Sequence, residues 1–516
     1  MAKQKSVCTL KKVNLRTSRI NKRKSSAKAL FVRSYKRCKL TYMQACGKIY
    51  SYNKKGKKGD DRVTMQTDYV SEELLRELSD SFRQNNGIPP ELFTRFRIKR
   101  GLRNADGTGV LVGASHLGNV HGYIINEGER EPIEGRLTYR GYNVYDLIHG
   151  LEQEDRFGFE EVGYLLMCGA LPNRRQLQEF QHTIGLERAL PDNFTEDMIM
   201  RAPSRDIMNK LAGATLALYS YDANPDETTV ENIMRQGISL TAKFPVIISH
   251  AYQAKRRYFD GDSMFLHVPD PDRSTAENIL HLVRPDGKYT DDEAKLLDRC
   301  LILHAEHGGG NNSSFTVRVT SSSGTDTYSA IAAAVSALKG PRHGGANLRV
   351  VRQFDEIKQN VSNWKDEEEV ADYLRKILDR EAGDGSGLIY GMGHAIYTLS
   401  DPRAVALKRA ARPLAEKKGF SDEMDLIELV EKLTPAIFKE KKGSDKPMCA
   451  NVDMYSGFVY KMLGLPKSLY TPLFATARIV GWMAHRLEEV TTGGKIIRPA
   501  YKPVVKNTAY INLENR

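Results

Sequence analysis

Residues 290–304, TDDEAKLLDRCLILH, carry the clearest signal for the fold class of this chain. Thr290 and Glu293 form a capping box, a pair three residues apart that satisfies free N–H groups at the start of a helix. Apolar residues follow at positions 296, 297, 300 and 301, a spacing that places them on one helical face. The stretch therefore predicts an amphipathic helix that runs toward His304 and His307.

The same kind of pattern recurs along most of the chain after the first seventy residues. Ser71 and Ser421 each precede acidic, leucine-containing runs with helical spacing, and residues 370–378 contain another apolar stripe of the same period. Alternating patterns are scarce, and those near 110–125 and 136–142 predict only short ribbons. We therefore predict a mostly α fold.

Changes in composition suggest where the chain divides. Two loops rich in glycine and charge, at 383–387 and 439–446, punctuate a region that could move as a unit. No internal repeat or heptad array is present. The expected divisions are a basic leader at 1–64, a large helical domain beginning at 65–345, a small helical domain at 346–458, and a return to the large domain at 459–516.

The positive charge of the chain is concentrated at its start. The formal net charge is +13, yet residues 1–60 alone carry 19 lysines and arginines and one acid. The remainder is mildly acidic, so a nucleic-acid partner is not indicated for it. We interpret the leader as a disordered basic tail or an upstream region added by an early start. A transit peptide and an anionic tether stay open as alternatives.

Cysteine content and hydropathy limit the class of protein further. Six cysteines in 516 residues are too sparse for a disulfide scaffold, and no pair has metal-type CxxC spacing. No apolar run approaches the roughly 20 residues that a membrane-spanning helix needs. We therefore expect a globular protein with reduced thiols in a cytoplasmic compartment, with no membrane association.

A histidine flanked by glycines provides the first chemical signal. Gly391-Met392-Gly393-His394 is followed by Asp401-Pro402-Arg403, so an arginine stands nine residues after the histidine. Glycines allow a tight bend at His394, and a guanidinium can hold a carboxylate with two hydrogen bonds. A proton donor beside a carboxylate clamp suits an anionic carbonyl substrate.

His304 and His307 precede a second glycine-rich segment. Their i, i+3 spacing is compatible with a metal site, with packed histidines or with a substrate contact. The following Gly308-Gly309-Gly310 would expose backbone N–H groups to an anion, which favours the substrate contact. There is no HExxH motif and no nucleotide-type GK[ST], so no metal or nucleotide site is predicted.

His343 and Asp453 are the remaining candidates for acid–base work. His343 lies between Gly340-Pro341 and Gly344-Gly345, where a helix start would lower its pKa and leave a neutral donor. Asp453 stands among apolar neighbours, which would make its carboxylate a stronger base. A helix-capping histidine and an N-cap aspartate stay open as alternatives for these two segments.

Three arginines could bind a dicarboxylate. Arg403, Arg478 and Arg498 follow in order, and each planar guanidinium matches the geometry of a carboxylate. Each taken alone is also compatible with an ordinary surface or ion-pair role. Their significance depends on the other motifs.

Taken together and in order, these motifs resemble the citrate synthase family from about residue 110 to about residue 505. The segments that carry the resemblance are Leu137-Thr138-Tyr139-Arg140-Gly141-Tyr142, Gly169-Ala170-Leu171-Pro172, the His307 loop, Gly340-Pro341-Arg342-His343-Gly344-Gly345-Ala346-Asn347, Gly391-Met392-Gly393-His394-Ala395-Ile396-Tyr397 with Asp401-Pro402-Arg403, Asn451-Val452-Asp453-Met454-Tyr455-Ser456-Gly457, and Arg478 and Arg498. The resemblance implies a two-domain helical fold and a homodimer.

The resemblance also implies roles for the catalytic residues. Asp453 would remove a methyl proton from acetyl-CoA while His343 polarises the thioester carbonyl. His394 would donate to the ketone oxygen of oxaloacetate as the carbon–carbon bond forms. Water would then cleave citryl-CoA to citrate and CoA, with no cofactor beyond the substrates.

The remaining site residues follow from the same resemblance. His307, Arg403 and Arg478 would hold oxaloacetate, and Arg498 would reach in from the second subunit. The CoA adenine would lie against the backbone of residues 388–393, including Leu388, Gly391, Met392 and Gly393.

The chain departs from the family pattern at two positions. Gly308 stands where the family often has an acid, and Thr398 stands where some relatives have a basic residue for CoA phosphate, so the phosphate contacts are unassigned. A 2-methylcitrate synthase using propionyl-CoA stays possible, because the two acyl groups differ by one methylene, worth only about 1–3 kcal/mol in a pocket. A catalytically silent binding protein and a metal hydrolase are rival hypotheses from different functional classes.

Overall fold

The computed structural model describes residues 70–127, 129–443 and 447–516. By contacts the chain divides into two compact units, one ending at Pro89 and the other beginning at Pro90. The predicted leader at 1–64 lies outside the described residues. In the described part of the first unit, α2 (Glu72–Asn85) begins as predicted, because Ser71 Oγ accepts a hydrogen bond from the Leu74 N–H at 3.1 Å.

The second unit opens with a short helix and an antiparallel sheet, ordered β1-β2-β3. The predicted ribbons correspond to this sheet, and its register shifts between His121 and Tyr123. The bounds are α3 (Glu91–Arg95), β1 (Gly118–Asn126), β2 (Glu129–Tyr139) and β3 (Tyr142–Asn143).

Helices make up most of the second unit after this sheet, which confirms the predicted fold class. They are α4 (Val144–Gln153), α5 (Phe159–Cys168), α6 (Arg174–Glu187), α7 (Ile207–Leu218), α8 (Val230–Lys255), α9 (Thr275–Val283), α10 (Asp291–His304), α11 (Asn312–Ser321), α12 (Thr327–Lys339), α13 (Ala346–Asn360), α14 (Glu367–Leu378), α15 (Pro402–Lys418), α16 (Ser421–Lys442), α17 (Asp453–Met462) and α18 (Tyr470–Thr491). Short 3-10 and π turns complete the unit: η1 (Arg100–Leu102), η2 (Thr195–Met200), η3 (Tyr219–Tyr221), η4 (Arg256–Asp260), η5 (Lys467–Leu469) and η6 (Leu513–Asn515).

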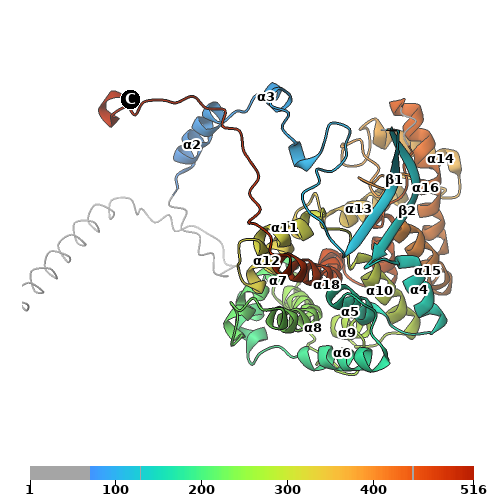
Figure 1. Ribbon diagram of the computed structural model, residues 1–516. Coiled ribbons are helices and arrows are strands. Elements are labelled where there is room, and N and C mark those ends of the chain that lie inside the picture. Colours follow the sequence, from blue (N-terminus) through green and yellow to red (C-terminus); the bar gives the residue numbers. More distant parts are fainter. Residues whose placement is uncertain (1–69, 128, 444–446) are drawn as a thin grey trace, which may run out of the picture. The chain divides into compact units, whose positions relative to one another are not determined.

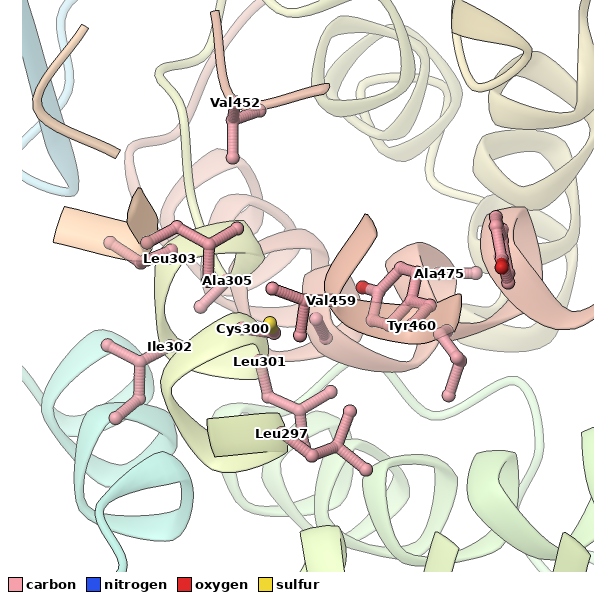
Figure 2. Packing of buried hydrophobic residues seen from close by; sticks show 14 of the residues in the cluster. Leu297, Cys300, Leu301, Ile302, Leu303, Ala305, Val452, Val459, Tyr460 and Ala475 are labelled. Carbon is pink, nitrogen blue, oxygen red and sulfur yellow. The ribbon is translucent and has the colours of Figure 1, made fainter. Parts of the chain in front are cut away.

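The helix predicted from residue 290 is α10, and both hydrogen bonds of its capping box are present. Its apolar stripe is buried, and Figure 2 shows Cys300 and Leu301 beside Val459 and Tyr460 of α17. Burying such an apolar side chain contributes about 1.5–3 kcal/mol, so this face is a large part of what holds α10 in place. The helix ends at His304, so the loop that contains His307 begins directly after it.

The core of the second unit is organised around α18, which is buried along nearly its whole length. It packs on α5, α8, α10, α11 and α12, and these helices surround it in Figure 1. The region 346–458 contains α13 to α16 and the start of α17, with α14 packed on α16 and α13 on α17. The division of the helical part at residues 345 and 458 stays a prediction.

Candidate active site

His394 lies in the loop between α14 and α15, and that loop is tied to the segment before Asp453. Gly391 and Gly393 have φ of +88° and +83°, a region that side chains disfavour. The backbone N–H of Gly393 donates to Cys449 O at 2.7 Å, and Asn451 N–H donates to Gly391 O at 2.8 Å. Two distant motifs of the sequence are therefore held side by side by main-chain hydrogen bonds.

The β1–β2 hairpin supports the same loop from another side. A side chain at Gly122 would place its Cβ 2.8 Å from the carbonyl oxygen of Ile396, so only glycine permits this approach. Gly135 N–H donates to Ser400 Oγ at 3.0 Å. The sequence did not indicate this support.

The ring of His394 is held as a neutral hydrogen-bond donor. Its Nδ1 accepts the N–H groups of Ile396 and Tyr397 at 3.1 and 3.2 Å, so the ring proton belongs on Nε2. Burial, followed by the charge of Arg403, lowers the pKa of His394 to about 4. Tyr397 stacks on the ring with centroids 4.7 Å apart, which fixes its orientation.

His307 lies directly against His394. Their ring centroids are 5.2 Å apart at an edge-to-face angle of 83°. Burial and then the charge of Arg403 hold the pKa of His307 well below its usual value. Its Nε2 is buried without a hydrogen-bond partner among the described residues. Two uncharged imidazoles thus share one small region.

His343 lies in the turn between α12 and α13. A helix does begin just after it, but Gly345 is the N-cap, so the hypothesis of a capping histidine is wrong. Burial first, and then the charge of Arg478, lower its pKa to about 4. His343 stands two residues before Gly345, the N-cap of the helix whose start we expected to lower this pKa.

Ser313 orients His343, a role the sequence did not reveal. Ser313 Oγ lies 3.0 Å from His343 Nε2 and accepts a hydrogen bond from Trp482 Nε1 at 3.1 Å. Because the tryptophan N–H occupies one lone pair, the single serine hydroxyl proton has two acceptors within reach, Asn311 Oδ1 at 3.0 Å and His343 Nε2. When that proton points to Nε2, the imidazole proton lies on Nδ1, where it could be donated to a substrate. No spacing rule links residues 313, 343 and 482.

Asp453 is the first residue of α17 and lies near Arg403. Val452, not Asp453, is the N-cap residue of this helix, so the hypothesis of an N-cap aspartate is wrong. Burial raises the pKa of Asp453 to about 6, against an opposing effect of Arg403. Its own N–H donates to Asn451 Oδ1 at 3.0 Å. A carboxylate with a raised pKa is suited to removing a proton.

Arg478, on α18, is fully buried, and its guanidinium is only partly used by the protein. Its Nε donates to the carbonyl oxygen of His304 at 2.6 Å, while both terminal nitrogens have no partner among the described residues. The carbon centre of the guanidinium lies 4.8 Å from the ring of Phe474. Burial lowers its pKa to about 10, so it stays charged near neutral pH. Unpartnered buried donors of this kind fit an anionic ligand.

Arg403 is buried and paired with Asp401. Its Nε and one terminal nitrogen reach the two carboxylate oxygens at 3.0 and 2.7 Å. Its charge acts on His307, His394 and Asp453, and that of Arg478 acts on His307 and His343. The two arginines therefore lie among all the histidines and the aspartate singled out from the sequence.

The other predicted residues are placed less centrally. Arg498 is exposed on the segment after α18 and makes no hydrogen bond or ion pair with any residue that the structure describes. Leu388 is 54% exposed, Gly391 is buried, and Met392 and Gly393 are half-buried. Thr398 is buried, and its hydroxyl has no partner within the described part of the chain.

Comparison with known proteins agrees with this geometry. The family described as "Citrate synthase, C-terminal domain" matches residues 107–500. The citrate synthase of Saccharolobus solfataricus is 32% identical over 369 residues, covering 71% of this chain and 89% of that protein. The 2-methylcitrate synthase 1 of Corynebacterium glutamicum is 34% identical over 390 residues, covering 75% and 91%.

Solved structures give the same result. Citrate synthase from Thermoplasma acidophilum, in a ternary complex with carboxymethyl coenzyme A and oxaloacetate, aligns with a TM-score of 0.65 and 26% identity. That alignment covers 81% of this chain and 99% of that one. The enzyme from Thermotoga maritima aligns with a TM-score of 0.63 and 30% identity, over 81% and 99%.

These matches identify the protein as an acyltransferase with a mostly helical fold. The chain belongs to the citrate synthase family. No helix in the described residues is long and apolar enough to cross a membrane.

Proposed function

We propose that this enzyme condenses acetyl-CoA with oxaloacetate and hydrolyses the citryl-CoA product to citrate and CoA. The observation that carries the proposal is the contact of two neutral imidazoles, His307 and His394, beside buried arginines and a carboxylate with a raised pKa. Such a set can hold a dianionic ketone and enolise a thioester without charging a histidine.

The chemistry would begin at the acyl thioester. Asp453 removes a proton from the methyl carbon while His343, oriented by Ser313, donates a hydrogen bond to the thioester oxygen. A thioester methyl is a very weak acid, so base and donor must act together. The electron pair released from the C–H bond becomes that of an enol or enolate.

The second step forms the new carbon–carbon bond. The enolic carbon attacks the ketone carbon of oxaloacetate, the C=O π bond opens, and His394 gives its Nε2 proton to the oxygen. The proton that Asp453 removed then returns to His394 through solvent, so both groups regain their starting charge. His307 would hold that oxygen, and Arg403 and Arg478 would hold the carboxylates. Water then attacks the thioester carbonyl of citryl-CoA, the C–S bond breaks, and CoA leaves as the thiol.

Closure of the region 346–458 would assemble the site. His394, Arg403 and Asp453 lie in that region, while His307, His343 and Arg478 lie outside it. A relative movement would therefore separate or unite the two halves, which would exclude water during the reaction. The backbone of residues 388–393 would receive the CoA adenine.

We also propose a homodimer in which Arg498 binds oxaloacetate in the partner's site. Its exposure on the segment after α18, apart from the buried arginines, supports a role outside its own chain. Sedimentation of the full chain with and without oxaloacetate tests the assembly.

A 2-methylcitrate synthase is the second candidate, supported by the 34% identity to such an enzyme. CoA release measured with acetyl-CoA and propionyl-CoA, each with oxaloacetate, separates the two. A higher kcat/KM for acetyl-CoA supports the proposal, and a higher value for propionyl-CoA favours the second candidate. If neither acetyl-CoA nor propionyl-CoA releases CoA, both candidate functions are refuted. Loss of activity in the presence of a chelator would favour metal chemistry instead.

A further inference from the structure

The side-chain amide of Asn451 joins the loop that carries His394 to the segment that carries Asp453. Its Nδ2 donates a hydrogen bond to the carbonyl oxygen of Gly393 at 2.9 Å, and its Oδ1 accepts the N–H of Asp453 at 3.0 Å. A carbonyl can only accept and an N–H can only donate, so these two partners fix which end of the amide carries the oxygen. One side chain therefore bonds to the residue before His394 and to Asp453 itself.

Both hydrogen bonds act on the peptide groups that lead into the two proposed catalytic residues. A peptide group is planar, so the position of the Gly393 carbonyl oxygen fixes the plane that contains the Cα of His394. The N–H of Asp453 fixes the plane of the preceding peptide in the same way. Gly393 has a φ of +83° and no side chain to restrict its rotation. The constraint on this peptide must therefore come from a neighbouring residue, and Asn451 supplies it.

The loop before His394 is confined on two further sides. A Cβ at Gly391 would lie 3.0 Å from Met454 Sδ and 3.2 Å from Met454 Cα, so the loop runs closely over the residue after Asp453. On the other side, Gln353 of α13 accepts the N–H of Tyr390 at 2.8 Å and donates to the carbonyl oxygen of Tyr390 at 3.2 Å. These contacts do not involve the Asn451 side chain, so the loop should stay folded when that amide is removed.

We propose that Asn451 is a positioning residue that holds the proton donor His394 and the base Asp453 at a fixed separation. Both residues lie in the region 346–458, so closure of that region would carry them together. The amide would keep the donor aligned with the enolic carbon that the base has just produced. This inference rests on the proposed function, which assigns the roles of His394 and Asp453.

Two reactions of the proposed enzyme separate the donor from the base. Exchange of the methyl hydrogens of acetyl-CoA with heavy water requires Asp453 and His343, whereas condensation also requires His394. Malate has a hydroxyl group in place of the ketone of oxaloacetate, so it cannot be attacked by the enolic carbon. Methyl exchange measured with malate therefore reports on the base without the condensation step.

Asn451→Ser removes the bond to Gly393 and can keep the bond to Asp453, because a serine hydroxyl can accept the N–H two residues further on. The kcat for condensation should fall roughly tenfold or more, since a hydrogen bond is lost and the donor is displaced. The rate of methyl exchange with malate should stay near that of the unchanged enzyme. Equal losses in the two reactions, or no loss in condensation, would overturn the proposal.

Asn278 provides a matched control on α9, an element that carries none of the site residues. Its Nδ2 donates to the carbonyl oxygen of Asp270 and its Oδ1 accepts the Asp270 N–H, both at 2.9 Å. Asn278→Ser should lower the melting temperature and leave the ratio of condensation to methyl exchange unchanged. A similar change of that ratio in the control would assign the effect to general destabilisation and refute the positioning role.

Amide hydrogen exchange of the full chain, followed by mass spectrometry, needs no variant. Peptides that cover residues 390–394 and 449–454 should change their protection in parallel when oxaloacetate is added. Protection that changes in only one of the two segments would contradict a fixed link between them. If the unchanged enzyme neither exchanges methyl hydrogens nor releases CoA, the proposed function fails instead. The two failures are therefore distinguishable.

Discussion

Replacing Asp453 with asparagine should abolish condensation and stabilise the fold at the same time. The asparagine has nearly the same size but cannot accept a proton from the thioester methyl carbon. The aspartate is buried, and this raises its pKa from 3.8 to about 6. The carboxylate is therefore held ionised at neutral pH in a place where ionisation is unfavourable.

The size of the effect follows from the pKa. Raising the pKa by about two corresponds to about 3 kcal/mol in the free energy of unfolding. This is an upper bound for the stability that Asp453→Asn gains at pH 7. Because folding raises the pKa of this acid, the ionised carboxylate destabilises the folded state. This loss of stability grows as the pH rises from the unfolded pKa of about 4 through the folded pKa of about 6. Below pH 4 both forms are neutral, and the gain disappears.

The assay compares melting temperatures of the two proteins between pH 4 and pH 8, together with CoA release. The melting temperature of Asp453→Asn should exceed that of the unchanged enzyme by an amount that grows with pH and levels off above about pH 7. In the unchanged enzyme, kcat/KM for acetyl-CoA should fall about tenfold per pH unit below pH 6. A variant that is active, or whose melting temperature shows no pH-dependent difference, would refute the assignment of Asp453 as a buried base.

Three other substitutions test the surroundings of the site. Ser313→Ala removes the partner of His343 and should lower kcat by roughly tenfold to a hundredfold, about 1–3 kcal/mol. KM for oxaloacetate, measured in steady-state kinetics, should not change. An equally large rise in KM for oxaloacetate would contradict a role limited to the thioester side. Arg498→Ala should raise KM for oxaloacetate, and mixing it with an Arg478→Ala variant should restore part of the activity if the sites are shared between subunits. Gly122→Ala would bring a Cβ within 2.8 Å of Ile396 O and should lower kcat through displacement of the His394 loop; unchanged kinetics would show that the hairpin does not position it.

The helical class could be read from the sequence because its signals are local, and the candidate site residues were predicted from the glycines and apolar residues next to them. A capping box and an apolar stripe lie within one helix, so α10 begins where residues 290–293 predict. The glycines at 391 and 393 adopt left-handed backbone angles, as the sequence around His394 suggested. The surroundings of Arg498, by contrast, stayed a prediction, since a single chain does not include the subunit it would reach.

The structure alone revealed how these residues are held. Ser313 and Trp482 meet across 169 positions, and Glu306 and His485 across 179. The hairpin supports the His394 loop through Gly135 and Ser400, which are 265 positions apart. No periodicity or spacing rule relates residues so far apart.

The sequence by itself determined that this chain forms amphipathic helices, and it predicted which imidazoles, arginines and carboxylate are candidates for chemistry. Only the tertiary structure decided which of their atoms are hydrogen-bonded, which are buried without a partner, and in which direction each pKa shifts. The physical reason is that helix formation depends on neighbours within a few residues. Desolvation and charge pairing depend instead on whatever the fold brings within a few ångströms.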